Sequence, residues 1–136
     1  MRKSLWMVFS WGVAQGCSVP DVVGIDAVDG DVVASLNPDE VEETVFEDDL
    51  PVTVSFDVSF DETMSLPSAR DNIWIEDAEG VELDVDLEAR LQTITVVPSG
   101  PLEPAQNHTL VIQAAIQDNN ETSMISGYRV AFFTAE

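Results

Sequence analysis

A strict alternation of apolar and polar side chains over residues 52–60 constrains the fold more than any other feature of this sequence. Valine or phenylalanine occupies every even position, and threonine, serine or aspartate every odd one. Successive side chains of a β-strand point to opposite faces, so the pattern predicts a strand with one face in a core and the other in water. The pattern places Val54 and Phe56 inside, and Ser55 and Asp57 outside.

Shorter runs with similar spacing recur along the chain, and turn residues separate them, including a predicted turn at residues 66–68. They lie at residues 32–36, 83–87, 94–96, 110–116 and 128–132. No segment after residue 16 shows a sustained helical period. About seven short strands with breaks every ten residues or so predict an all-β fold, an antiparallel β-sandwich. We expect Ile112 and Phe132 to join Val54 and Phe56 in its core.

The first 17 residues have the order of a bacterial export signal. Arg2 and Lys3 form a basic start, and residues 5–14 are mostly apolar but too few to span a bilayer. Small residues then precede Cys17, the one cysteine of the chain. This order resembles the lipobox of bacterial lipoproteins, in which cleavage occurs before a cysteine that then carries lipid. The alternative is an ordinary signal-peptidase site after Gly16.

The lipoprotein resemblance implies a division of the chain and a location. Residues 1–16 are the expected signal peptide, residues 17–33 the lipidated cysteine and a tether, and residues 34–136 the folded domain. Ser18, rather than aspartate, follows the cysteine, and in this family that favours the outer membrane. The sequence thus predicts an exported protein held at the outer membrane or cell surface, with its lipid as the membrane anchor.

The mature chain is strongly acidic. Removal of residues 1–16 leaves 120 residues with three arginines and 26 acidic residues, a formal charge of −23. Such a chain repels nucleic acid and anionic lipid headgroups, which excludes both as partners. With one cysteine it forms no internal disulfide, so core packing must stabilise the domain.

A series of segments in order resembles the SbsA-type bacterial Ig-like domain of cell-envelope proteins. They are Asn37-Pro38, residues 60–64 (FDETM), residues 73–80 (IWIEDAEG), residues 93–98 with 101–102, residues 107–118 and residues 130–134. The resemblance covers residues 34–135 and implies an Ig-like sandwich with a structural or binding role and no catalysis. Two features depart from the family: His108 stands where tyrosine is usual, and residues 118–121 lack the usual glycine.

The residue inventory argues against an enzyme. His108 is the one histidine and no lysine follows residue 16, so a serine–histidine–aspartate arrangement or a zinc site lacks its components. The carboxylate pairs Asp57/Asp61 and Asp84/Asp86 could act on glycans, but solvated strand faces explain them more simply. The sequence therefore predicts a non-catalytic protein.

Two kinds of binding site remain as candidates. Calcium prefers exposed clusters of carboxylates, and Asp57, Asp61 and Glu62 form one such cluster in the sequence; the default expectation is no cofactor and diffuse screening by cations. Trp74 lies between two isoleucines, and a strand cannot bury all three on one face. An exposed tryptophan is typical of a surface that contacts a protein or glycan; the alternative is that a loop or the tether covers it.

Two functions follow from these observations. The first is a non-catalytic envelope lipoprotein whose Ig-like domain has a structural or adhesive role. The second is an accessory subunit that binds one protein partner in an export or envelope-assembly complex.

Overall fold

The computed structural model describes residues 19–37 and 43–136. Those ranges contain ten strands and one short helix. In chain order they are β1 Val22–Asp29, β2 Asp31–Leu36, β3 Glu43–Val45, β4 Ser55–Phe60, α1 Leu66–Asn72, β5 Ile73–Glu76, β6 Glu82–Leu83, β7 Val85–Arg90, β8 Thr93–Pro98, β9 Asn107–Ile112 and β10 Tyr128–Phe133.

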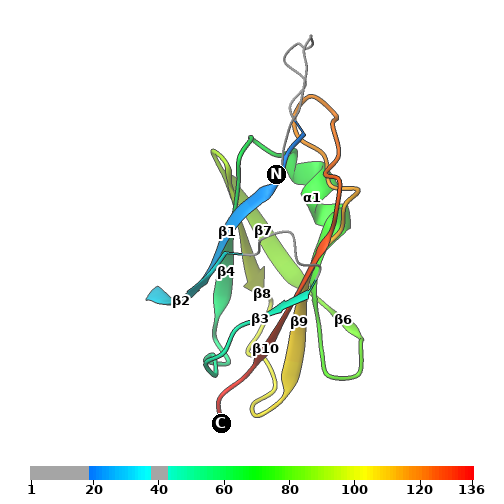
Figure 1. Ribbon diagram of the computed structural model, residues 1–136. Coiled ribbons are helices and arrows are strands. Elements are labelled where there is room, and N and C mark those ends of the chain that lie inside the picture. The colour runs from blue at the N-terminus through cyan, green and yellow to red at the C-terminus, as the bar shows by residue number, and fades with distance from the viewer. Residues whose placement is uncertain (1–18, 38–42) are drawn as a thin grey trace.

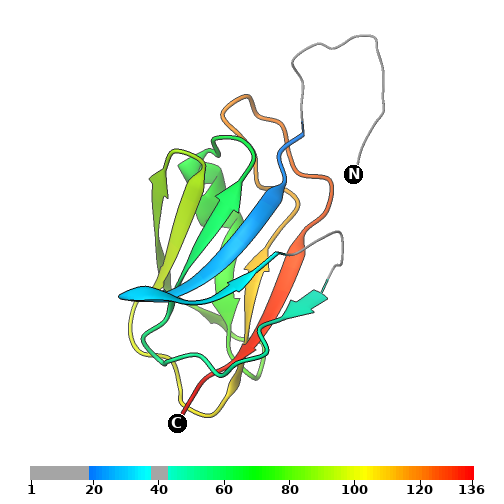
Figure 2. The ribbon, with the colours of Figure 1, turned by 60° about the vertical axis from the view of Figure 1, so that its left-hand side comes forward.

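The strands form two five-stranded sheets packed face to face (Figure 1). Sheet A has the order β2-β1-β4-β8-β7, and sheet B the order β3-β10-β9-β5-β6. Neighbouring strands are antiparallel except that β3 runs parallel to β10. Figure 2 shows the same two sheets with the strands of sheet A turned towards the viewer. The predicted all-β sandwich is confirmed.

The core lies between the two sheets and follows the predicted alternation. Val54, Phe56, Ile112 and Phe132 are all buried, as predicted. The ring of Phe56 lies 4.9 Å from that of Phe132 in the opposite sheet. Because β4 sits in the middle of sheet A and β10 is an inner strand of sheet B, this pair joins the centres of the two layers.

The predicted tether over residues 17–33 is wrong for its described part, because residues 22–29 form β1. This strand pairs with both β2 and β4, and Val22, Ile25 and Ala27 enter the core. The register of β1 shifts near both of its ends, so its apolar residues do not keep a period of two. The folded domain therefore begins before residue 22, rather than at residue 34.

The run at residues 83–87, predicted as one strand, is divided between the two sheets. Leu83 pairs with Ile75 in sheet B, whereas Leu87 pairs with Val96 in sheet A. Asp84 stands between the two strands. This division adds β6, and β1, β3 and β5 lie outside the periodic runs, which explains why ten strands are described where about seven were predicted.

Residues 66–68, predicted as a turn, instead begin α1. Ser65 is its N-cap and accepts a hydrogen bond from the backbone N–H of Ser68, and Pro67 suits the first helical turn because it lacks an N–H. Seven residues are too few for a sustained helical period, so the sequence pattern gave no signal.

The predicted run at 110–116 ends as a strand at Ile112, and a long loop over residues 113–127 leads to β10. Buried Asp118 organises this loop: its Oδ1 accepts hydrogen bonds from the N–H groups of Asn120 at 2.8 Å and Thr122 at 2.9 Å. An aspartate that accepts these two N–H groups stabilises the turn at residues 118–122.

Candidate functional site

The outer face of sheet B carries a tryptophan, a carboxylate and an arginine that are joined by hydrogen bonds. Trp74, Val111 and Arg129 lie side by side across β5, β9 and β10. The indole Nε1 of Trp74 donates to Oε2 of Glu76 at 3.1 Å, and a guanidinium nitrogen of Arg129 donates to its Oε1 at 2.9 Å. We call these four residues the Trp74 surface.

Strand periodicity places Trp74 on the outer face of β5. Ile73 and Ile75 are buried in the core, which turns Trp74 and Glu76 to the opposite face of β5. Trp74 is half-buried rather than fully exposed. Val111 faces outwards but is buried, because the long side chains of Trp74 and Arg129, its neighbours in register, cover it.

The charges of the Trp74 surface are internally matched. The indole N–H of Trp74 holds the pKa of Glu76 below its usual range, and Arg129 lowers this pKa further. Desolvation of the carboxylate raises the pKa, but by less than the Trp74 hydrogen bond lowers it. Glu76 is therefore an anion at neutral pH and orients both neighbours. The arrangement presents a positioned aromatic side chain beside a neutralised ion pair, which suits contact with a glycan or protein surface.

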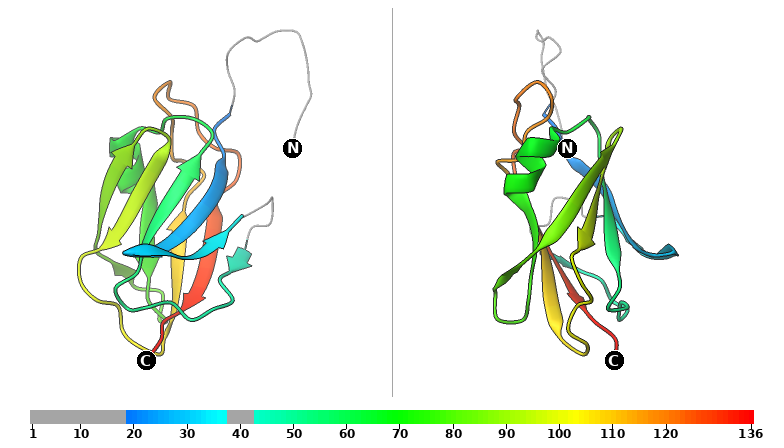
Figure 3. Two further views of the ribbon diagram at one scale, coloured as in Figure 1. Left: turned by 90° about the vertical axis from the view of Figure 1, so that its left-hand side faces the viewer. Right: turned by 180° about the vertical axis from the view of Figure 1, so that it is seen from behind.

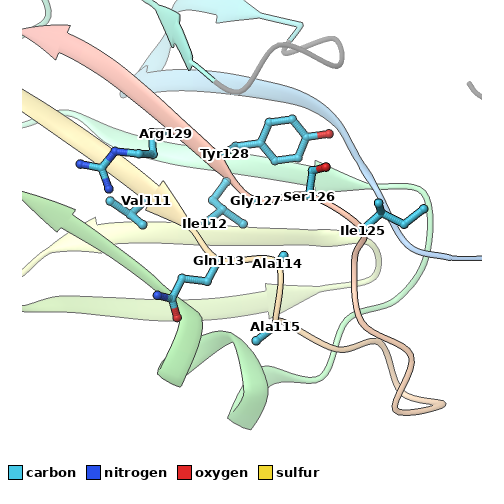
Figure 4. Close-up of a pocket in the computed structure, with 10 residues that line it drawn as sticks. All are labelled: Val111, Ile112, Gln113, Ala114, Ala115, Ile125, Ser126, Gly127, Tyr128 and Arg129. Atoms are coloured by element: carbon cyan, nitrogen blue, oxygen red, sulfur yellow. The ribbon is translucent and has the colours of Figure 1, made fainter.

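An open hollow adjoins the Trp74 surface where β9 ends and β10 begins (Figure 4). Its volume is about 650 Å³, and its lining residues are Val111, Ile112, Gln113, Ala114, Ala115, Ile125, Ser126, Gly127, Tyr128 and Arg129. Gly127 is required here, because a Cβ at this position would lie 2.8 Å from the carbonyl oxygen of Ile112. Arg129 is the charged residue of this lining, so the hollow offers little for acid–base chemistry.

The structure does not bring the calcium candidates Asp57, Asp61 and Glu62 together. Asp57 accepts a hydrogen bond from the Thr95 hydroxyl at 2.7 Å on the outer face of sheet A. Asp61 lies beyond the end of β4 and accepts one from the N–H of Asp21 at 2.9 Å; desolvation raises its pKa. Among the described residues, no group of three or more acidic, histidine or cysteine side chains is placed to hold a metal.

His108 has no access to a substrate. Its side chain is 1% exposed and stacks on the Phe132 ring, with centroids 5.3 Å apart. Burial lowers the pKa of His108, and within the described residues its Nε2 has no hydrogen-bond partner. The histidine is a packing residue of the core, and it is not a candidate catalytic base.

The predicted lipidation site, Cys17, lies outside the described residues. Sequence reasoning identified Trp74 but missed Glu76, Arg129 and the hollow. Two signals could have indicated the first two: Glu76 shares a strand face with Trp74 at a spacing of two, and Arg129 is one of three cations after residue 16. The hollow had no such signal, since the end of β9, the start of β10 and the loop between them form its wall, and no local pattern reports how they pack.

None of the described helices is long and apolar enough to cross a membrane.

Comparisons with known proteins identify the family of the domain. The sequence profile described as the bacterial Ig-like domain matches residues 27–134, and no curated protein matches. Among solved structures, one match is native Escherichia coli alpha-2-macroglobulin, with 13% sequence identity and a TM-score of 0.55. That match covers 87% of this chain but 6% of the other, so it shows the fold alone. With its profile match over most of its length, the chain belongs to the bacterial Ig-like domain family.

Proposed function

We propose that this protein is an exported, non-catalytic lipoprotein of the bacterial cell envelope, with one Ig-like domain of the SbsA type that binds another envelope component. The Trp74 surface carries the binding part of the proposal. It is the place on sheet B where an aromatic ring, an ion pair and an adjoining hollow meet. Bacterial Ig-like domains typically occur in extracellular or surface proteins, which agrees with the signal-like residues 1–17.

The anchor is Cys17, cleaved at its amino side and acylated. Two or three acyl chains bury enough methylene groups, at about 0.8 kcal/mol each, for stable attachment to a membrane. Ser18 directs the protein to the outer membrane by the sorting preference of lipoproteins. Cells grown with a fatty-acid probe should label the wild type but not Cys17→Ser, and the variant should leave the membrane fraction. Unchanged fractionation without probe uptake would refute the anchor.

Site-specific photo-crosslinking in the native cell tests the binding role. A photoreactive residue at Val45 or Thr109 lies on the outer face of sheet B, since both flank Ala131 in register. The matched control is Glu88, which lies on the outer face of sheet A opposite Thr95. We expect adducts from the first two positions, reduced by Trp74→Ala, and none from Glu88. Equal adducts from both faces would contradict the assignment of the surface.

The adducts also decide between the two predicted roles. Glycan or a scatter of envelope proteins identifies a structural or adhesive role. A single stoichiometric protein identifies an accessory subunit of an export or assembly complex. Both outcomes are read from the same two positions, Val45 and Thr109, on the outer face of sheet B.

A further inference from the structure

One end of the sandwich is fixed directly to the start of the folded chain. Asp21 donates its N–H to Oδ1 of Asp61, accepts at its carbonyl the N–H of Asp61 at 3.0 Å, and accepts at its carboxylate the hydroxyl of Tyr128. These bonds connect β1 to the end of β4 and to the start of β10. We call this end, with α1, the turn at residues 91–92 and the loop over 113–127, the proximal end; Figures 1 and 3 show these segments together.

The proximal end lies close to the proposed lipid. Cys17 precedes Asp21 by four residues, which span at most about 14 Å when fully extended. Strand β1 has eight residues and is about 26 Å long at roughly 3.3 Å per residue. An acyl anchor on Cys17 therefore cannot reach the opposite end of the sandwich, and the proximal end must remain near the bilayer.

Among the described residues, the two most exposed large apolar side chains both belong to the proximal end. Leu91 is 83% exposed and Ile125 is 82%, whereas the next, Val45, is 58%. Leu91 forms the β7–β8 turn with Gln92, whose carbonyl accepts the Phe60 N–H at 2.8 Å and whose side chain donates to the Asp61 carbonyl at 3.3 Å. Ile125 precedes Tyr128, which binds Asp21, by three residues.

Leu91 is also held in an unfavourable backbone conformation. Its φ of 54° lies in the left-handed region, which glycine, asparagine or aspartate adopts more readily than leucine in a two-residue hairpin turn. A leucine at this position costs stability through its backbone and also exposes its side chain to water. Leu91 thus combines a strained backbone with an exposed apolar side chain, a combination found at functional sites.

The charged residues are also distributed unevenly between the two ends of the sandwich. The three arginines after residue 16 lie towards the proximal end: Arg70 in α1, Arg90 in register with Gly24 through β4 and β8, and Arg129 beside Tyr128. Where the structure describes it, the opposite end carries only acidic charges, in the turn after β1, the loop after β3 and the β5–β6 turn. The proximal end has acidic residues too, so it does not attract anionic lipid. It is the less repelled of the two ends.

We infer that the proximal end rests on the bilayer that holds the Cys17 lipid, with Leu91 and Ile125 inserted at the zwitterionic headgroup level. The inference rests on the proposed lipidation. The short connection between Cys17 and Asp21 keeps the proximal end near the bilayer. The side chains of Leu91 and Ile125, which we call the tips, determine which part of that end contacts lipid. The domain then stands upright on the membrane, so the Trp74 surface faces sideways, and the acidic end points away.

Depth-dependent quenching on the acylated full-length protein tests this inference. Single cysteines labelled with a fluorescent bimane are placed at the tips, Leu91→Cys and Ile125→Cys, and at the opposite end, Asp48→Cys and Glu79→Cys. The acylated Cys17 offers no thiol to the label. In phosphatidylcholine vesicles with brominated acyl chains we expect both tip labels to lose most of their emission and both distal labels to keep theirs. Equal quenching at the two ends, or none at the tips, would overturn the inference.

A variant with both apolar tips replaced tests whether Leu91 and Ile125 contact the lipid or merely lie near it. Leu91→Asn combined with Ile125→Asn is compared with the wild type, using a label at Asn120→Cys in the same loop. We expect the label's quenching to fall severalfold while the melting temperature holds or rises, because asparagine accepts the positive φ more readily. Unchanged quenching would show that the tips do not hold the end on lipid.

Flotation with the same vesicles distinguishes failure of this inference from failure of the proposed lipidation. Every variant should float if Cys17 is acylated, whatever its orientation. Flotation without tip quenching overturns the docked orientation alone. Loss of flotation in the wild type overturns the anchor, and the orientation with it.

Discussion

Truncation of Phe56 to alanine should remove a large part of the domain's stability. Phe56 is fully buried in the middle of sheet A, and its ring contacts Phe46 at 5.9 Å and Phe132 at 4.9 Å. Loss of a buried phenylalanine costs about 3–5 kcal/mol. The upper part of that range applies, because β1 and β8 hydrogen-bond to both sides of β4 and keep the surrounding backbone from collapsing into the cavity. Whole domains are stable by about 5–15 kcal/mol.

Adjacent residues provide the matched controls for Phe56→Ala. Phe132→Ala should cost a similar amount, whereas Phe133→Ala, the same truncation on the outer face of β10, should cost at most about 2 kcal/mol because that ring is 37% exposed. Asp57→Ala should be nearly neutral: the lost bond to Thr95 is offset by removal of a like charge directly opposite, Asp26.

Urea unfolding, followed by circular dichroism, measures these four changes. The midpoints should shift while the slopes stay the same, since the surface exposed on unfolding changes little. If Phe133→Ala or Asp57→Ala destabilises as much as Phe56→Ala, the assignment of inner and outer faces is wrong.

Three further predictions concern charge. The melting temperature should rise with sodium chloride and gain most of its increase by about 0.15 M, where the screening length is ~8 Å; a flat or falling curve would contradict self-repulsion as a major cost of folding. Calcium and magnesium at equal millimolar concentrations should stabilise alike and modestly, and a calcium-specific increase that Asp61→Asn abolishes would restore the carboxylate candidates. For His108→Phe, the free energy of unfolding relative to wild type should increase as the pH falls below about 6.5, by at most about 1.4 kcal/mol per pH unit. The reason is that burial lowers the pKa of His108, so the unfolded wild-type chain binds a proton that the folded one refuses; a pH-independent difference would refute this.

The candidate site was only partly predictable. The spacing of Ile73 and Ile75 was enough to place Trp74 on the outer face, because alternation is a local property of a strand. The partners of Trp74 depend on register between strands: Arg129 comes from β10, 55 residues further along the chain, and reaches Glu76 across β9. Register results from the packing of whole sheets, which one segment's pattern does not specify.

The sequence by itself determined that this chain forms a sandwich and which residues fill its centre, since the alternation in β4, β9 and β10 reports burial on one face whatever the neighbours are. Only the tertiary structure decided that residues 22–29 are an inner strand, because bulges interrupt their period and pairing on both sides compensates. It also decided that residues 82–90 contribute to both sheets: β6 belongs to sheet B, β7 belongs to sheet A, and Asp84 lies between them. Partnership between distant strands depends on three-dimensional packing, and that information is absent from any single segment.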